Sequence, residues 1–277
     1  MTSTAASIPT RPDLQGIPET MLWTLHNRAS DALRPDGLLR DPDAIRIYQA
    51  IDYDYRGRFG KPDGSHALRS RLFDDALRPW LAAHPGGLVV ELACGLETQC
   101  RRCDDGQVRW LCVDVPEAIA IRERFLPASE RCRHLGRSAL DLSWLDEVDS
   151  DRGVFITAQG LLMYFSEDQV RGLLTAIGER LPGAVLMFDT IPPFFSRKTL
   201  KGYWKTASYR APPMPWGIRR GDIAAVLRRW LPQASDIRLE PYGMTRGGLG
   251  RWLTLFSLTP GLRDLLPALV RVEIGAA

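Results

Sequence analysis

The sequence has 277 residues, 45% of them hydrophobic, and a chain of this kind can bury one large core. Its formal net charge of +3 is too small to indicate a nucleic-acid-binding protein by itself. No apolar run approaches the roughly 20 residues of a membrane span, and Met1 to Gln15 lack the apolar core of a signal peptide. We therefore expect a cytoplasmic protein without membrane contacts.

The first 18 residues are predicted to form a flexible arm, because Pro9, Pro12 and Pro18 are spaced among small and polar residues. Three helical patterns follow, at about 20–33, 42–51 and 66–83.

From residue 87 onward, apolar strand-like runs alternate with helical segments. These runs cover 87–93, 108–114, 131–137, 153–158 and 184–189, and further strands are expected near 235–240 and 269–274. Ser166 is a predicted N-cap that opens a helix between the fourth and fifth runs. The alternation predicts an α/β fold with a doubly wound, mostly parallel sheet of seven strands.

The first strand ends in Glu91 and is followed by a turn of small residues that contains Gly95. Nineteen residues beyond Gly95, the second apolar run ends in Asp114, where nucleoside-binding folds place a carboxylate on ribose hydroxyls. The alternative is an ordinary strand-turn-helix in which Gly95 serves only the turn. Asp114 favours the nucleoside site.

The loop after the first strand also indicates which nucleoside binds. A dinucleotide site needs the pattern G-x-G-x-x-G for its pyrophosphate, whereas this loop has Ala93, Gly95 and Thr98. Glu91 would repel a pyrophosphate but attract a cationic sulfonium. S-adenosylmethionine is positively charged and has no phosphate, so it is the predicted cofactor.

The five cysteines are an odd number, and several lie in or beside predicted strands, which is typical of reduced thiols. Cys100 and Cys103 form C-x-x-C, but no second pair lies at zinc spacing. We therefore expect no metal.

Several segments, taken together, resemble the leucine carboxyl methyltransferase-like class I methyltransferases, in the branch of the tetracenomycin polyketide O-methyltransferase. The matching segments are Ile51–Asp54, Arg69–Asp75, Glu91–Thr98, Trp110–Glu117, Ser138–Val148, Gly160–Tyr164 and Trp216–Ile218. The resemblance implies a Rossmann-like fold with an N-terminal helical cap. It also implies one methyltransferase domain over 19–277, with a lid insertion after strand five at about 190–216.

The same resemblance assigns further cofactor contacts. Arg69 would bind the methionine carboxylate, and Asp141 with the Leu142 backbone would bind adenine. Gln159 stands where the family's usual glutamate contacts the methionine end, which leaves the charge of the site open. Two alternatives remain: Arg69 as a solvated helix arginine, and Asp141 as a helix N-cap before Ser143.

The stretch 190–221 contains no Asp or Glu, although it holds seven basic and six aromatic residues. The basic residues are Arg197, Lys198, Lys201, Lys205, Arg210, Arg219 and Arg220. Such a segment could cover a site as a cationic, apolar-walled lid for an anionic acceptor. The alternative is a solvated basic loop that carries a few core aromatics.

The methyl acceptor is the harder question. Methyl transfer from a sulfonium is an in-line displacement, and a hydroxyl or amine acceptor often needs a base. The histidines, which are His26, His66, His84 and His134, do not lie at the ends of the fourth or fifth strand. A carboxylate is already ionised and needs no base. We therefore expect an O-methyltransferase for a carboxylate, or a hydroxyl, of a small aromatic or polyketide-like metabolite of secondary metabolism.

Four residues are assigned to the acceptor side by position alone. Tyr164 and Arg210 are the candidate catalytic residues, and Tyr203 and Trp204 are the candidate substrate-binding residues. The expected partner is a small-molecule acceptor, without nucleic acid, and the oligomeric state stays open.

Three other functions remain as alternatives. The first is a protein C-terminal carboxyl methyltransferase, as in the leucine-specific relatives. The second is a nucleic-acid-binding module, since basic residues interleaved with aromatics can engage phosphates and stack bases. The third is a cofactor-binding protein without chemistry, which the glutamine at position 159 suggests.

Overall fold

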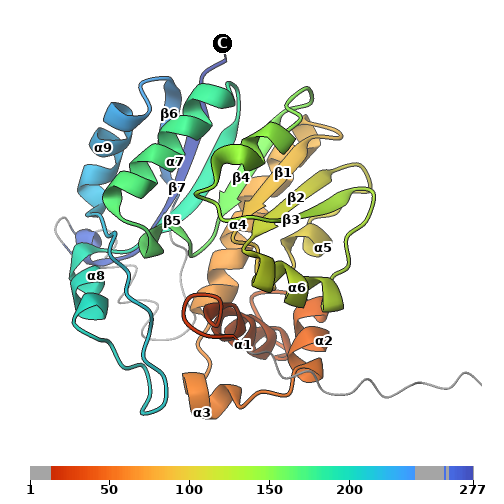
Figure 1. Ribbon diagram of the computed structural model, residues 1–277, viewed down its shortest axis with the longest axis vertical. Coiled ribbons are helices and arrows are strands. Elements are labelled where there is room, and N and C mark those ends of the chain that lie inside the picture. The colour runs from red at the N-terminus through yellow and green to blue at the C-terminus, as the bar shows by residue number, and fades with distance from the viewer. Residues whose placement is uncertain (1–13, 241–258, 260–261, 277) are drawn as a thin grey trace, which may run out of the picture.

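The computed structural model describes residues 14–240, 259 and 262–276, and these form a sheet with helices on both faces (Figure 1). The strands are β1 (Leu88–Leu92), β2 (Arg109–Asp114), β3 (Cys132–Gly136), β4 (Val154–Ala158), β5 (Val185–Thr190), β6 (Ala234–Glu240) and β7 (Ala268–Ile274). Their order is β3-β2-β1-β4-β5-β7-β6; β7 runs antiparallel to β5 and β6, and the other neighbouring pairs are parallel. The predicted seven-stranded, doubly wound sheet is confirmed. Of the predicted arm, residues 1–13 lie outside the described range.

The strand order sets the place of the site. The chain winds outward from β1 to β3 and then returns to β4, which pairs with β1 on its other side. In such sheets the ligand crevice lies outside the carboxyl ends of the strands where the winding reverses. Every residue of β1, β4 and β5 is buried, as expected of parallel strands covered on both faces.

Four helices precede the sheet, and the others connect or flank its strands. The α-helices are α1 (Thr20–Ala32), α2 (Pro42–Ala50), α3 (Tyr55–Phe59), α4 (Ser65–Ala83), α5 (Gln99–Arg102), α6 (Pro116–Phe125), α7 (Glu167–Arg180), α8 (Pro193–Leu200) and α9 (Ile223–Trp230). The 3-10 helices are η1 (Leu142–Glu147), η2 (Leu162–Tyr164), η3 (Arg220–Asp222) and η4 (Arg263–Leu265). Within the described ranges, no helix is long and apolar enough to cross a membrane.

Local sequence signals explain where the helices begin. Asp41 accepts the Ala44 N–H at 2.9 Å and precedes Pro42, so α2 starts with both a cap and a favourable proline. Ser166 and Gln169 form a reciprocal capping box at the start of α7. The helices predicted at 20–33, 42–51 and 66–83 agree with α1, α2 and α4 to within one residue at each end.

Two apolar layers fix the sheet between its helices. On one face, Val90 and Ile156 belong to the core that includes residues of α7 and α9. On the other face, Val89 and Phe155 belong to a second core with residues of α4. Successive residues of β1 therefore point to opposite faces, and Glu91 shares the α4 face with Val89.

The segment 190–216, which we call the lid segment, contains α8 and a hairpin that reaches the cap formed by α1 to α3 (Figure 1). Tyr209 of the hairpin is 1% exposed and packs edge-to-face on Phe59, with ring centroids 4.8 Å apart. The guanidinium of Arg58 lies 5.1 Å from the centre of the Tyr209 ring. The hydroxyl of Ser208 donates to the Gly57 carbonyl at 2.7 Å. The lid segment is thus anchored on α3.

We expect Tyr209→Ala to release the hairpin, because truncating a buried aromatic side chain removes about 3–5 kcal/mol of packing. Limited trypsin digestion should then cleave after Lys201 and Lys205 several-fold faster than in the wild type. The matched control is Trp204→Ala in the same hairpin, since Trp204 is 59% exposed. Equal cleavage rates in both variants would contradict this anchoring role.

Candidate active site

The cofactor loop, residues 93–98, follows β1 and is tied to the end of β2. The Gly95 N–H donates to Asp114 Oδ2 at 2.8 Å, and the Val115 N–H donates to Oδ1 at 2.8 Å. Gly95 has a φ of 43°, and a Cβ there would lie 3.0 Å from Cβ of Met21 in α1. Glycine therefore lets the cap helix approach the loop closely.

Asp114 has the chemistry of a ribose-binding carboxylate. Each of its oxygens accepts one backbone N–H and keeps a second acceptor position that a ribose hydroxyl can use. Burial raises the pKa of Asp114, and the two N–H donors oppose this shift. Gly95 and Asp114 are therefore in direct contact, and their predicted roles in binding the cofactor stay predictions.

Glu91 lies in β1 and faces Arg122 of α6. It is 2% exposed, its Oε2 lies 3.6 Å from Nη2 of Arg122, and it accepts from the Cys112 thiol at 3.7 Å. Burial raises the pKa of Glu91 to about 7, although the Arg122 charge opposes the rise. Its predicted contact with a sulfonium stays a prediction.

Arg69 from α4 meets the ends of β4 and β5. Its Nη1 donates to Asp189 Oδ2 at 3.1 Å, and the Gly160 N–H donates to Oδ1 at 2.5 Å. A Cβ on Gly160 would lie 2.7 Å from the Arg69 guanidinium, so the arginine packs across the glycine that follows Gln159. Sequence reasoning missed Asp189, although it stands at the end of the fifth strand, where the strand-end rule could have found it.

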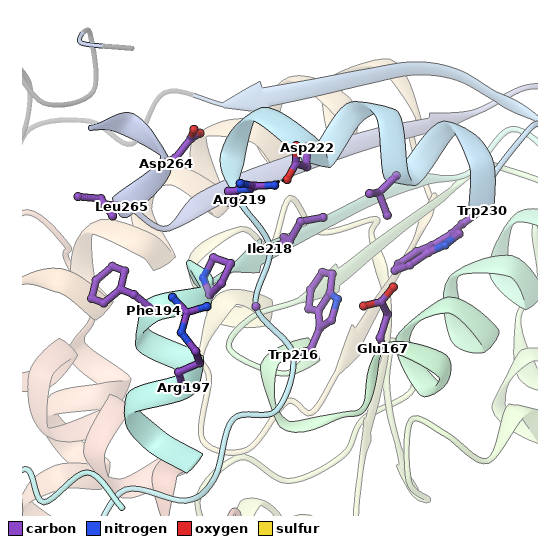
Figure 2. Close-up of a pocket in the computed structure, with 13 residues that line it drawn as sticks. Glu167, Phe194, Arg197, Trp216, Ile218, Arg219, Asp222, Trp230, Asp264 and Leu265 are labelled. Atoms are coloured by element: carbon purple, nitrogen blue, oxygen red, sulfur yellow. Dashed lines mark hydrogen bonds and ion pairs between the residues drawn. The ribbon is translucent and has the colours of Figure 1, made fainter. Parts of the chain in front are cut away.

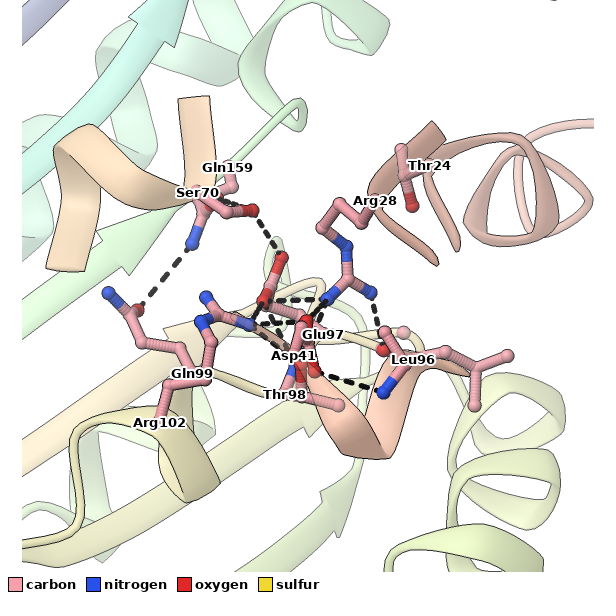
Figure 3. Close-up of polar contacts among 12 residues, drawn as sticks. Thr24, Arg28, Asp41, Ser70, Leu96, Glu97, Thr98, Gln99, Arg102 and Gln159 are labelled. Atoms are coloured by element: carbon pink, nitrogen blue, oxygen red, sulfur yellow. Dashed lines mark hydrogen bonds and ion pairs between the residues drawn. The ribbon is translucent and has the colours of Figure 1, made fainter. Parts of the chain in front are cut away.

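Gln159 lies in a polar group with Ser70 and Gln99 (Figure 3). Its Oε1 is 3.5 Å from the Ser70 hydroxyl, and its Nε2 is 3.5 Å from Gln99 Oε1. Both contacts are at the long limit of a hydrogen bond. Ser70 also lies 2.9 Å from Oε2 of Glu97 in the cofactor loop. The structure thus brings Arg69 and Gln159 together just after the carboxyl end of β4.

A buried charge network lies beneath the cofactor loop (Figure 3). Nη1 of Arg28 donates to Asp41 Oδ2 at 2.9 Å, and Nη1 of Arg102 donates to Glu97 Oε1 at 2.7 Å. Nε of Arg102 donates to Asp74 Oδ2 at 2.7 Å. Although burial would raise the pKa of Glu97, the two guanidinium groups hold it well below its usual value. This network links the cap, α4 and the loop, and sequence reasoning missed it.

Asp141 serves as the N-cap of η1, the alternative to an adenine-binding role that the sequence left open. Its Oδ1 accepts the Ser143 N–H at 3.2 Å and the Ser143 hydroxyl at 2.6 Å, and these hydrogen bonds lower its pKa. The Leu142 carbonyl accepts from Arg180 at 3.4 Å. The predicted adenine contacts of Asp141 and Leu142 stay predictions.

The four residues predicted for the acceptor side lie in different environments. Tyr164 packs beside Ile191, and burial raises its pKa to about 12, so its hydroxyl stays protonated and can donate. Tyr203 is half-buried, with Nζ of Lys198 located 4.2 Å from its ring centre. Trp204 and Arg210 are exposed and pair across the hairpin. Tyr164 is therefore partly buried, whereas Trp204 and Arg210 lie on the surface.

One group of side chains has the donor types of a metal site. Sγ of Cys112, Sγ of Cys132 and a ring nitrogen of His134 lie within 4.8 Å of one another. Arg122 donates to Cys112 Sγ at 3.3 Å and to His134 Nε2 at 3.3 Å. The permanently charged guanidinium thus already binds two of the three donors. All five cysteines are free thiols, as expected.

A groove of about 550 Å³ opens between α8 and α9 (Figure 2). Trp216 and Ile218 line it beside the charged side chains of Arg197, Arg219 and Asp222. Its lining includes no residue of the cofactor loop and neither member of the Arg69–Asp189 pair. We therefore do not assign it to the predicted cofactor site.

Residues 22–178 match the leucine carboxyl methyltransferase family. The chain belongs to this family. It is 36% identical over 254 residues to the tetracenomycin polyketide synthesis O-methyltransferase TcmP of Streptomyces glaucescens, covering 90% of this chain and 82% of that protein. It is 32% identical over 182 residues to the S-adenosyl-L-methionine-dependent methyltransferase dpfgK of Gibberella zeae, covering 59% and 61%.

The fold comparison agrees with family membership. A protein of Thermobifida fusca YX assigned as a methyltransferase superposes with a TM-score of 0.53 at 14% identity, covering 94% of this chain and 99% of that chain. The family predicted from the sequence segments is thus confirmed, and so is the predicted enzyme class. The protein is an S-adenosylmethionine-dependent O-methyltransferase. Its cofactor supplies, when bound, a methyl group on a cationic sulfonium.

We expect Glu91 to make stability depend on pH. Its pKa is about 7 in the folded protein and about 4.3 in an unfolded chain. A raised folded-state pKa means that the contribution is fully present below the unfolded pKa and is lost as pH rises through about 7. Relative to Glu91→Gln, the wild type should lose up to about 3 kcal/mol of unfolding free energy between pH 4.5 and pH 8.

Urea unfolding of both proteins across this pH range measures the effect. The glutamine variant is the control, because it keeps the shape of the side chain and does not titrate. A difference in unfolding free energy that stays constant with pH would show that Glu91 keeps an ordinary pKa.

Proposed function

We propose that the enzyme methylates a carboxylate of a small aromatic or polyketide-like acceptor. The observation that carries this proposal is the chemistry at the ends of β4 and β5. Both oxygens of Asp189 already accept hydrogen bonds, and Tyr164, with a pKa of about 12, keeps its proton. Neither is a ready base, and a carboxylate acceptor needs none because it is ionised at neutral pH.

The positions of the histidines support the same proposal. His26 lies in α1 and binds the Gly60 carbonyl, and His66 lies in the first turn of α4, where burial lowers its pKa to about 3. His84 stacks on Trp80, with ring centroids 4.4 Å apart. His134 belongs to β3, at the far edge of the sheet. A hydroxyl or amine acceptor would need a base from elsewhere.

The name of the Streptomyces relative supports a polyketide-like acceptor, while the family name also allows a protein C-terminal carboxylate. Mass spectrometry of extracts incubated with enzyme and labelled cofactor identifies the acceptor through its mass shift. Mild alkali then separates the chemistry, since a methyl ester releases labelled methanol and a methyl ether does not. Label that stays bound after alkali would rule out the carboxylate, and a labelled protein would favour the C-terminal alternative.

For the cofactor, we propose that Gly95 and Asp114 hold the ribose and that Asp141 with Leu142 holds the adenine. Arg69 and Gln159 would bind the methionine end. The proximity of Arg69 to Gly160 supports this assignment. Glu91, in its ionised form, would act through its negative charge.

On the acceptor side, we propose that Tyr164 donates a hydrogen bond to the acceptor and that Arg210 attracts its negative charge. Tyr203 and Trp204 would contact its apolar part. The residues of the site would align the carboxylate with the methyl group and exclude water. We also propose that this small-molecule reaction takes place in the cytoplasm, without nucleic acid.

If Asp114 accepts hydrogen bonds from both ribose hydroxyls, Asp114→Ala should weaken the binding of S-adenosylmethionine by about 1.5–3 kcal/mol, because two hydrogen bonds to a charged acceptor are lost. Isothermal titration calorimetry measures the affinity, and circular dichroism checks the fold. The control is Glu117→Ala, which removes a nearby exposed carboxylate in the first turn of α6. Unchanged affinity in a folded Asp114→Ala protein would remove Asp114 from the site.

If the lid segment attracts an anionic acceptor, Arg210→Met should raise the acceptor's KM several-fold while the cofactor's Kd stays the same. Lys201→Met is the matched control, since Lys201 is also an exposed cation of the lid segment. Steady-state kinetics with the identified acceptor tests this expectation. Equal KM values for the wild type and Arg210→Met would exclude Arg210 from acceptor binding.

A further inference from the structure

Two buried arginines hold three consecutive carbonyl groups of the cofactor loop. Nη1 of Arg122 donates to the Gly95 carbonyl at 3.0 Å and to the Glu97 carbonyl at 2.7 Å. Nη2 of Arg28 donates to the Leu96 carbonyl between them at 2.7 Å. Arg28 belongs to α1 in the cap and Arg122 belongs to α6, so side chains of two separate helices hydrogen-bond to the loop.

Both guanidinium groups are themselves held in place from behind. Arg122 is fully buried and also donates to the thiols of Cys100 and Cys112, each at 3.3 Å. Arg28 is 1% exposed and donates to Asp41 at 2.9 Å. All three nitrogens of Arg122 and both Nη atoms of Arg28 make hydrogen bonds, so the N–H groups that face the loop have fixed directions. Hydrogen bonds from charged donors in a dry environment are also the stronger ones.

The cofactor loop needs such support because its own sequence does not dictate its shape. Ala93 has a φ of 54°, a left-handed conformation that L-residues other than glycine rarely adopt. The Gly95 N–H donates to the Asp114 carboxylate, and the Gly95 carbonyl accepts from Arg122. A shift of the Gly95 peptide would therefore move the group that orients Asp114.

We propose that Arg28 and Arg122 are positioning residues that set the affinity for S-adenosylmethionine by fixing residues 93–98 in their binding shape. Neither has to touch the cofactor. The inference rests on the proposed placement of the cofactor at Gly95 and Asp114. Preorganisation of this kind acts on cofactor binding and leaves the transfer step unchanged once the site is filled.

The test uses Arg122→Lys, Arg28→Lys and Arg122→Met. A lysine keeps the positive charge, but its single ammonium cannot reproduce the planar fork that binds two loop carbonyls and two thiols together. Each variant should raise the Kd of S-adenosylmethionine roughly tenfold or more. Hydrogen–deuterium exchange of the peptide that contains residues 93–98 should become faster. The kcat at saturating cofactor should stay within twofold of the wild type.

Ile177→Ala is the matched control for lost stability. Ile177 is 1% exposed, lies in α7, and packs in the core on the opposite face of the sheet from Arg122. The substitution should lower the melting temperature while leaving cofactor affinity and loop exchange unchanged. If Ile177→Ala weakens cofactor binding as much as the arginine variants do, the effect of the arginine variants is general destabilisation and the proposal is wrong.

Folded lysine variants with a cofactor Kd within twofold of the wild type and unchanged loop exchange would also overturn the proposal. If Arg122→Met does not fold, the two lysine variants decide the matter alone. Asp114→Ala separates this inference from the proposed placement of the cofactor at Gly95 and Asp114. If only Asp114→Ala binds the cofactor more weakly, the positioning role of Arg28 and Arg122 is wrong and the proposed cofactor site stands. Unchanged binding in all variants would reject the placement of the cofactor and the arginine inference together.

Discussion

Arg102 makes contact with carboxylates from three parts of the chain that are far apart in sequence. It donates to Asp74 in α4, to Asp41 before α2 and to Glu97 in the cofactor loop, at distances between 2.7 and 3.0 Å. Removing charges from water is costly, and the cost is recovered only when every partner is in place. The cap, α4 and the cofactor loop therefore have to assemble together, because a partial network would leave a charge buried without its partner.

This constraint explains how a loop with a single glycine of the usual pattern can still hold a defined shape. Glycine-rich loops reach their shape through backbone freedom. Here the shape comes from outside the loop, from the cap beneath and from α6 beside it. The cap is consequently part of the structure that holds residues 93–98 in place.

Sequence reasoning succeeded where the signal is local or periodic. Strand runs, the Ser166 cap and the acidic end of β2 at Asp114 all follow from residues close together in the chain. It also left open the N-cap alternative for Asp141, which the structure adopts. These features depend on backbone geometry that a few neighbouring residues decide.

The charge network could not be predicted in the same way, because its partners are far apart in sequence. The hydroxyl of Thr98 donates to Asp41 at 2.6 Å across a separation of 57 residues. One signal was available: Arg28 and Arg122 occupy positions among the buried residues of their amphipathic helices, where an arginine needs partners. The exposure of Trp204 and Arg210 likewise depends on how Tyr209 docks on α3, a contact between distant segments.

The place of β7 in the sheet has a consequence for how the protein is made. β7 follows β6 in the chain, yet it lies between β5 and β6 and pairs antiparallel with both. During synthesis on the ribosome, the outer edge of β5 stays without its neighbour, and β6 has no strand to join, until residues 268–274 have emerged. An open edge of this kind can pair with other chains. The newly made protein therefore stays open to aggregation along this edge until β7 is complete.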